Sequence, residues 1–256
     1  MFGKKSNYIN GAWVEGEGEI NNINPSDTND LIDTYSNASS NQLNDAVSSA
    51  KIAQKKWEKV GIEKRANILN NIGSEIIKQS KEIGTLLSRE EGKTLPEGIG
   101  EVVRSGQQFQ YYAASALRQF GENIASTREG VSVEVTREPV GVCGIISPWN
   151  FPIAIAAWKA APAMAFGNAI VLKPASQTPA SAIALAKIIS DQADIPEGLF
   201  NLVLGGGSTI GHQISGHLDI DAISFTGSVS VGQTIYMEAA KTMKKMQLEM
   251  GSKNPL

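Results

Sequence analysis

The chain has 256 residues, of which 41% are hydrophobic and 19% are charged, and its formal net charge is −3. This length suits one large or two small globular domains, and the composition is ordinary for globular proteins. The slightly acidic balance, without a block of like charges, argues against a surface for nucleic acids or acidic membranes.

The single cysteine, Cys143, excludes a disulfide within the chain, and this fits a reducing compartment. Residues 1–6 carry charge, but no apolar run follows them, so a signal peptide is not predicted. No apolar stretch reaches the length of a membrane span. The sequence therefore predicts a soluble cytoplasmic protein.

Short strands are expected near the start of the chain. The Asn10-Gly11 dipeptide, which lies between β-prone residues, predicts a tight hairpin over residues 8–14. Residues 31–35 are predicted to form a further edge strand.

Three helices are predicted next. The pattern Ser39-x-x-Gln42 has the form of a capping box and predicts the start of the first helix. A second helix, with apolar residues at helical spacing from 68 to 87, is expected to end near Gly92, and a third is expected over residues 99–120. The aromatic residues of the third helix are interpreted as packing rather than as a binding site; these are Phe109, Tyr111 and Tyr112.

Residues 130–137 alternate apolar and polar side chains. This pattern predicts a half-exposed strand of the kind that can pair with another subunit. The alternative is an ordinary edge strand of a sheet.

From residue 140 onward, strands and helices alternate. Strands are predicted at residues 140–146, 169–172, 199–204, 221–225 and 247–250. Helices are predicted between them at residues 152–167, 179–193, 210–214 and 229–243. This alternation predicts an α/β fold with an open parallel sheet and helices on both faces.

The first of these strands ends in the motif Pro148-Trp149-Asn150-Phe151-Pro152. Pro148 removes a backbone donor and stops the strand, so Asn150 is predicted to lie on a stiff turn at the carboxyl end of the strand. Ligands of open α/β sheets bind at this edge, and a side-chain amide there can donate hydrogen bonds to a developing oxyanion. The alternative is a strand–helix turn without chemistry.

The other strands of this half end in further polar or glycine-rich groups. Lys173 offers a point charge for a ribose hydroxyl or a phosphate, and Glu249 offers a carboxylate. Glycines at 205–207 and 227, each before a helix, would let a phosphate approach the backbone. Neither run matches a phosphate-binding fingerprint, so each could be only a turn. Cys143 lies inside a strand and is expected to be buried and inert, not a nucleophile.

Four motifs in this order resemble those of the aldehyde dehydrogenase superfamily: PWNFP at 148–152, KPAS at 173–176, FTGSVSVG at 225–232 and LEMGSKNP at 248–255. The resemblance extends from Tyr8 to the last residue. The residues around these motifs are most similar to dehydrogenases that act on 2-oxoglutarate semialdehyde (2,5-dioxopentanoate), with succinate-semialdehyde dehydrogenases close behind.

The resemblance implies a Rossmann-like fold of the aldehyde-dehydrogenase type that is truncated before the catalytic domain. Residues 1–120 would form the N-terminal hairpin and helices of the cofactor-binding domain. Residues 121–139 would form an oligomerisation arm, and residues 140–256 the dinucleotide-binding βα units. A homo-oligomer is expected for the full-length protein.

The resemblance further implies NAD(P)-dependent oxidation of a small aldehyde to its carboxylate through a cysteine thioester, with no metal. Asn150 would hold the oxyanion, and Glu249 would activate the water that hydrolyses the thioester. The cofactor would lie against Ile146, Pro148, Trp149, Lys173, Ala175, Ser176, Gly207, Gly211, Phe225, Thr226, Gly227, Ser228 and Gly232.

Two departures from the family pattern change these expectations. Ser176 stands where NAD-preferring members often carry glutamate, and because a serine would not repel a 2′-phosphate, NADP is expected to be accepted as well as NAD. The nucleophilic cysteine of the family lies a few dozen residues past the glutamate, whereas this chain stops at Leu256, so the chain alone is expected to be inactive. The alternatives are an inactive NAD(P)-binding fragment and an interaction module that docks through residues 130–137.

Overall fold

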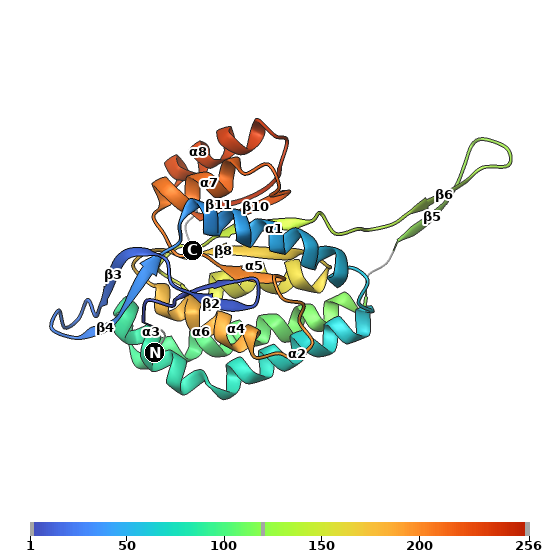
Figure 1. Cartoon of the computed structure of the whole chain (residues 1–256). Coiled ribbons are helices and arrows are strands. Elements are labelled where there is room, and N and C mark those ends of the chain that lie inside the picture. Colours follow the sequence, from blue (N-terminus) through green and yellow to red (C-terminus); the bar gives the residue numbers. More distant parts are fainter. Residues whose placement is uncertain (1–2, 119–120, 254–256) are drawn as a thin grey trace.

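The computed structural model describes residues 3–118 and 121–253. Within these residues, the centre of the molecule is a sheet of seven strands (Figure 1). In spatial order they are β11 (Lys245–Met250), β10 (Ala222–Gly227), β7 (Val142–Ile146), β8 (Ala169–Lys173), β9 (Phe200–Leu202), β1 (Asn7–Ile9) and β2 (Ala12–Val14). Strands β7 to β11 run parallel, whereas β1 is antiparallel to β9 and β2. The predicted α/β fold with a mainly parallel sheet is confirmed.

Helices cover both faces of this sheet. They are α1 (Ser40–Trp57), α2 (Ile62–Lys78), α3 (Ser80–Glu91), α4 (Leu95–Ala116), α5 (Ala154–Ala165), α6 (Pro179–Ser190), α7 (His212–Gly216) and α8 (Val229–Ala240), with a π-helical turn, η1 (Gly207–Gly211), directly before α7. Figure 1 shows α1, α7 and α8 on one side of the sheet and α5 and α6 on the other, with α2 and α4 packed outside α5. Within residues 3–118 and 121–253, no helix combines the length and apolar character needed to cross a membrane.

The order of the parallel strands places a topological switch beside β7. From β7 the chain moves outward through β8 and β9, then returns to β10 on the other side of β7 and continues to β11. Ligands of doubly wound sheets bind outside the carboxyl ends of the strands at such a point. Every residue of β7 and β8 is buried, as a parallel sheet covered on both faces requires.

Two local predictions near the N-terminus are confirmed. Asn10 and Gly11 join β1 to β2 with φ angles of 49° and 82°, the left-handed conformation of a type I′ hairpin turn. Ser39 caps α1, because its hydroxyl accepts a hydrogen bond from the Gln42 backbone N–H while the Gln42 side chain accepts one from the Ser39 N–H.

The strand predicted at residues 31–35 forms as β4 (Leu31–Asn37), but it does not border the main sheet. It pairs with β3 (Glu17–Ile23) in a separate two-stranded ribbon. The β3 sequence EGEINNI begins with acidic residues and a glycine. It lacks the alternation of apolar and polar residues that predicts a strand.

The single helix predicted across residues 68–87 is wrong. The segment forms two helices, α2 and α3, which meet at Gln79 (φ −90°, ψ 9°). Both helices pack against α4, so the apolar stripe continues across the break and helical spacing could not reveal it. Gly92 ends α3 with a φ of 91°, close to the predicted end.

The third predicted helix begins at Leu95 rather than at residue 99. Thr94 and Glu97 form a second capping box, and this signal was overlooked in the sequence. The helix ends at Ala116, with Leu117 as its C-cap, so the predicted end near residue 120 is also wrong.

The aromatic residues of α4 divide into packed and exposed side chains. Phe109 is fully buried, as the packing interpretation requires, and Tyr112 is half-buried. Tyr111 is 63% exposed and meets the Tyr112 ring edge-on. The packing interpretation is therefore wrong for Tyr111.

The strand predicted over residues 130–137 forms as β6 (Ser132–Val135). It pairs with β5 (Glu122–Ala125) in a hairpin that projects from the body of the molecule (Figure 1). Every residue of both strands is exposed. The expected half-burial is wrong, because neither face of the hairpin rests on another element of the described chain.

Candidate functional site

The predicted site residues gather at the carboxyl edge of the parallel sheet. Strand register places Ile146 opposite Lys173 on one side and Phe225 on the other. The Ser176 hydroxyl donates a hydrogen bond to the Gly205 carbonyl (3.2 Å), which joins the segments after β8 and β9. The turns that follow β7, β8, β9 and β10 therefore lie along one edge.

Asn150 lies on an exposed bend between β7 and α5, and two charged side chains fix this bend. One carboxylate oxygen of Glu101 accepts hydrogen bonds from the backbone N–H groups of Ile153 and Ala154, both at 3.1 Å, and so caps the N-terminus of α5. Lys93 donates to the other Glu101 oxygen (2.6 Å) and to the Asn150 carbonyl (3.0 Å). The backbone of the bend is held in place, while Asn150 itself remains at the surface.

Sequence reasoning missed both Lys93 and Glu101. Glu101 is 5% exposed although it lies in a helix of the outer layer. A carboxylate among the apolar positions of a helix is rarely buried without a partner, and this was the available signal for Glu101. Lys93 lies in the short loop after α3 and carried no comparable signal.

A hollow of about 500 Å³ opens beside this bend. It is lined by Asn150, Phe151 and Trp158 on one side and by α4 residues, including Arg104, on the other. The Arg104 guanidinium donates to Gln107 Oε1 (3.5 Å), and it makes no ion pair with a carboxylate among the described residues. The hollow can therefore present an amide and the unpaired Arg104 to a small molecule, beside the carboxylates of Glu91, Glu97 and Glu101.

Lys173 ends β8 and is only 3% exposed. Its ammonium donates to the Pro174 carbonyl (2.5 Å), and burial lowers the pKa of Lys173 to about 8. A Cβ at Gly211 would lie 3.5 Å from the Lys173 Cε, so the side chain passes close to η1. The residue lies at the predicted place, but its ammonium is turned into the protein.

One of the glycines after β9, Gly205, is required by its backbone. Gly205 has a φ of 154°, and a Cβ there would lie 2.5 Å from Cγ1 of Ile210. The Gly211 N–H donates to the Gly206 carbonyl (3.1 Å) and closes η1. A Cβ at Gly207 would meet no atom within 4 Å, so this turn has room for an incoming group.

Helix α8 begins at the same edge, directly after β10. Ser228 is its N-cap, with the hydroxyl accepting from the Val231 N–H (3.4 Å), and Ser228 is exposed. The positive end of the helix dipole therefore faces this edge. A Cβ at Gly232 would lie 2.4 Å from Sδ of Met250, so close packing explains this glycine, as it does Gly227, where a Cβ would meet the Phe225 ring at 2.5 Å.

Glu249 lies on β11, opposite Thr226 of β10. It lines a second hollow, of about 730 Å³, together with Lys159 and Trp158 of α5. Lys159 is 9% exposed, and burial lowers the pKa of Lys159 to about 8. Sequence reasoning missed Lys159, although a single charge in the apolar helix AIAAWKAAPAMA was a visible signal.

Trp158 lines both hollows. The two predicted catalytic residues, Asn150 and Glu249, therefore lie in neighbouring hollows that share one wall. The other predicted contacts follow the same edge of the sheet: Ile146 and Phe225 are buried, Pro148, Ala175, Ser176 and Thr226 are half-buried, and Trp149 is exposed.

Cys143, the only cysteine of the sequence, is buried in β7. Burial raises the pKa of its thiol to about 12, so it is a poor nucleophile, as predicted. In the part of the chain that the structure describes, no three His, Cys, Asp or Glu side chains are arranged to hold a metal ion.

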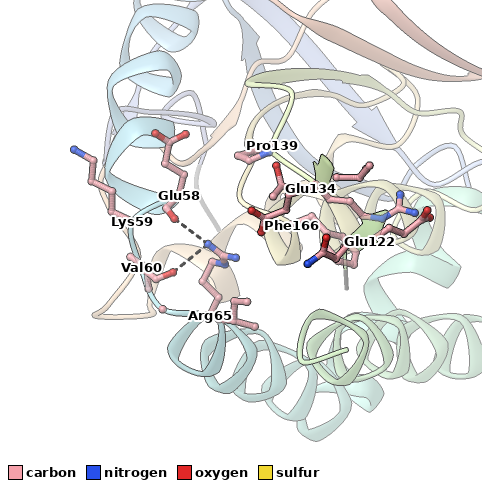
Figure 2. A pocket seen from close by; sticks show the side chains of 15 residues that line it. Glu58, Lys59, Val60, Arg65, Glu122, Glu134, Pro139 and Phe166 are labelled. Carbon is pink, nitrogen blue, oxygen red and sulfur yellow. Dashed lines mark hydrogen bonds between the residues drawn. The ribbon is translucent and has the colours of Figure 1, made fainter. Parts of the chain in front are cut away.

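A separate hollow of about 640 Å³ lies at the base of the β5–β6 hairpin (Figure 2). Arg65 lies between the α1–α2 loop and this hairpin, and its Nη1 donates to the carbonyls of Val60 (3.0 Å) and Glu58 (3.3 Å) (Figure 2). These bonds satisfy carbonyls after the end of α1. The lining contains none of the predicted site residues, so this hollow is not the candidate site.

Comparisons with known proteins identify a family. The model of the aldehyde dehydrogenase family matches residues 13–256. The alpha-ketoglutaric semialdehyde dehydrogenase of Bacillus subtilis (strain 168) is 41% identical over 254 residues, which cover 98% of this chain and 51% of that protein. The alpha-ketoglutarate semialdehyde dehydrogenase of Haloferax volcanii is 38% identical, with 100% and 53% covered.

The fold also matches solved structures. A crystal structure of betaine aldehyde dehydrogenase from Staphylococcus aureus in complex with NAD+ is 33% identical and superposes with a TM-score of 0.95. The match covers 98% of this chain and 50% of that chain. The chain thus spans about half the length of the curated relatives it matches.

Proposed function

Because the chain belongs to the aldehyde dehydrogenase family, we propose that it forms the cofactor-binding part of an enzyme that oxidises an aldehyde to its carboxylate with NAD or NADP. The observation that carries this proposal is the Asn150 bend, which Glu101 and Lys93 fix at the topological switch of the sheet. An amide side chain carried on a fixed backbone bend at this edge suits a reaction that develops negative charge on an oxygen atom.

The residues of the edge fit a dinucleotide. The N-terminus of α8 is exposed at Ser228, and the position of Gly207 is open, so a pyrophosphate could approach both backbones. The buried hydroxyl of Ser147, directly after β7, has no hydrogen-bond partner among the described residues and is available to a ligand. The NAD+ complex of the Staphylococcus aureus relative supports the same assignment. The nicotinamide, when bound, accepts a hydride.

Each polar residue of the site has a proposed role. The Asn150 amide donates to the aldehyde oxygen as it gains charge, and the Glu249 carboxylate accepts a proton from the water that hydrolyses the thioester. Lys173 hydrogen-bonds the hydroxyls of the adenine ribose once its ammonium has exchanged the Pro174 carbonyl for them. Cys143 is too deeply buried to attack an aldehyde, so we place the nucleophilic thiol outside these 256 residues.

We propose a semialdehyde as the substrate, with 2-oxoglutarate semialdehyde first and succinate semialdehyde as the alternative. Three of the relatives are named as dehydrogenases of the first compound. Arg104 supports this choice, because it lines the same hollow as Asn150 and has no carboxylate partner among the described residues. A substrate that carries its own carboxylate would supply that partner.

NADP is proposed as a cofactor beside NAD. The Ser176 side chain is neutral, and its hydroxyl is engaged with the Gly205 carbonyl. A carboxylate at this position would repel a 2′-phosphate, whereas Ser176 does not. We further propose that the enzyme acts in the cytoplasm as a homo-oligomer that uses the arm at residues 121–139.

A test requires the full-length protein that contains this chain. Asn150→Ala is expected to lower kcat by roughly 100-fold for every aldehyde, since it removes a donor to the oxyanion. Arg104→Gln is expected to raise KM for the semialdehyde by roughly tenfold, about the loss of one charge-assisted hydrogen bond, and to leave KM for an uncharged aldehyde of equal length unchanged. NADH formation measures both effects, and Asn41→Ala, an exposed change on α1, is the control.

Full activity of the Asn150→Ala enzyme would contradict the proposed chemistry. A second candidate function is an NAD(P)-binding module without turnover, which the isolated position of Cys143 favours. Saturable cofactor binding together with the absence of aldehyde oxidation by the full-length protein would support that alternative.

A further inference from the structure

A chain of hydrogen bonds connects α5 to the end of the sheet. Strand register places Ser224 of β10 directly opposite Gln247 of β11. The Lys159 ammonium donates to the Ser224 hydroxyl (2.8 Å) and to the Gln247 Oε1 atom (3.0 Å). On its other side, Gln247 Nε2 donates to Glu249 Oε1 (2.7 Å). A buried cation and the carboxylate of the site are thus joined through one amide.

The orientation of this amide is fixed by its partners. An ammonium can only donate hydrogen bonds, so the Gln247 atom that faces Lys159 must be the carbonyl oxygen. The Ser224 hydroxyl donates to the same oxygen. The amide NH2 group is therefore left to point along β11, toward the residue two positions later, which lies on the same face of the strand.

We propose that Gln247 is a positioning residue: its side-chain amide bridges the Lys159 ammonium and the Glu249 carboxylate, and it holds that carboxylate over the hollow that Trp158 and Lys159 also line. The role of Glu249 as a base rests on the proposed function, but the bridge itself does not. Without the bridge, Glu249 is an exposed side chain on the outermost parallel strand and is free to turn to solvent.

The bridge couples two ionisable groups, and this coupling can be measured in the chain itself. The titratable residues that line the hollow are Tyr112, Lys159 and Glu249. The negative charge of Glu249 raises the pKa of Lys159 against the larger lowering by burial. Removing the carboxylate with Glu249→Gln should therefore lower the pKa of Lys159. A fall of roughly half a pH unit is expected for two charges that interact across a largely aqueous path.

The test is a double-mutant cycle in which NMR follows the side-chain titration of Lys159. Glu249→Gln is compared in the unaltered chain and in Gln247→Met, which keeps the length of the side chain and removes its three hydrogen bonds to Lys159, Ser224 and Glu249. In the Gln247→Met background, we expect Glu249→Gln to change the pKa of Lys159 by less than half as much as it does in the unaltered chain. Gln247→Asn, whose amide is one methylene too short to reach Glu249, should give the same loss and remains informative if the methionine variant folds poorly.

Gln233→Met, an exposed substitution on α8, is the matched control and should leave the shift unchanged. The inference would be overturned if Glu249→Gln changed the pKa of Lys159 equally with and without the Gln247 amide. It would also be overturned if Glu249→Gln did not change this pKa in the unaltered chain. Cofactor titration of the same samples separates the two proposals. A chain that binds NADP but has no bridge contradicts only the inference, whereas an intact bridge without cofactor binding contradicts only the proposed function.

Discussion

Two buried lysines make the charge of the site depend on pH in the mildly alkaline range. Lys159 and Lys173 each have a pKa of about 8 because burial disfavours their charged forms. Both therefore change charge in the mildly alkaline range, two units or more below an exposed lysine. If either ammonium contributes to the affinity for a ligand, that contribution must decrease as the pH rises through this range.

Lys173 leads to a prediction about cofactor affinity. If its ammonium binds the ribose hydroxyls, the protonated form is the binding form, and affinity for NADP should fall as pH rises from 7 through 8 to 9. A drop of up to roughly tenfold per pH unit above the pKa is the limit for one proton. Lys173→Met should bind more weakly at pH 7 and show little change with pH. Titration calorimetry at several pH values measures this, and a pH-independent affinity in the unaltered chain would refute the role of Lys173.

Site residues that belong to a recognisable motif could be predicted from the sequence. The residues that hold this motif in position could not. Asn150 lies where proline punctuation placed it, and Ser176 lies beside the glycine run. Lys93 and Glu101, which fix the Asn150 bend, are separated from it by about fifty residues of chain. Their role arises from the packing of α4 on α5, and no local pattern records that contact.

Two of the crossover helices next to the sheet, α5 and α6, share one capping device. A buried glutamate from the outer layer accepts the first free N–H groups of each helix. Glu101 does so for α5, and Glu90 does so for α6 through Ala180 (2.5 Å) and Ser181 (2.9 Å). Both glutamates are 5% exposed or less. The outer helices thereby set the position of the inner ones.

This device predicts a large effect of a small substitution. Glu101→Gln keeps the shape of the side chain but leaves Lys93, whose side chain is 11% exposed, with Glu91 at 3.6 Å as its remaining counter-ion. The free energy of unfolding should fall by about 2 kcal/mol, less than for a buried charge that has lost every counter-ion. Urea unfolding followed by circular dichroism measures the loss. Glu63→Gln, on the exposed face of α2, should stay within about 0.5 kcal/mol, and an equal effect of both changes would contradict the capping role.

Element prediction succeeded where one signal decides the structure. The apolar strands β7 and β8 and the Asn10-Gly11 hairpin were all predictable because composition or turn chemistry fixes them locally. The break at Gln79 and the polar strand β3 were not, because each depends on contacts with a partner element and not on a signal within the segment itself. For α2 and α3 that partner is α4, and for β3 it is β4.

The projecting hairpin is the feature that only the whole molecule explains. Its β5–β6 ribbon exposes apolar side chains on one face, with Ile124 paired across to Val133 and both more than one-third exposed. Exposed apolar surface on an open strand edge favours association with another chain. This supports the proposed oligomerisation arm at residues 121–139.

Charges on that face should therefore weaken assembly. In the full-length protein, Val133→Glu combined with Ile124→Lys is expected to raise the dissociation constant of the oligomer at least tenfold, or about 1.4 kcal/mol. Ser132→Glu, on the opposite face of β6, is the control. Sedimentation velocity at a series of concentrations provides the measurement. Identical profiles for the unaltered protein, the double variant and the control would show that the arm is not part of the interface.

Direct titration of the chain with NAD+ and NADP+ tests whether the strand ends form a dinucleotide site. The four tryptophans provide a fluorescence signal, and Trp149, 54% exposed beside Asn150, is the reporter nearest the site. We predict saturable quenching by both nucleotides, with NADP+ at least as effective as NAD+, and a weaker signal in Trp149→Phe. A chain that is folded by circular dichroism but shows no saturable response to either nucleotide would contradict a dinucleotide site at these strand ends.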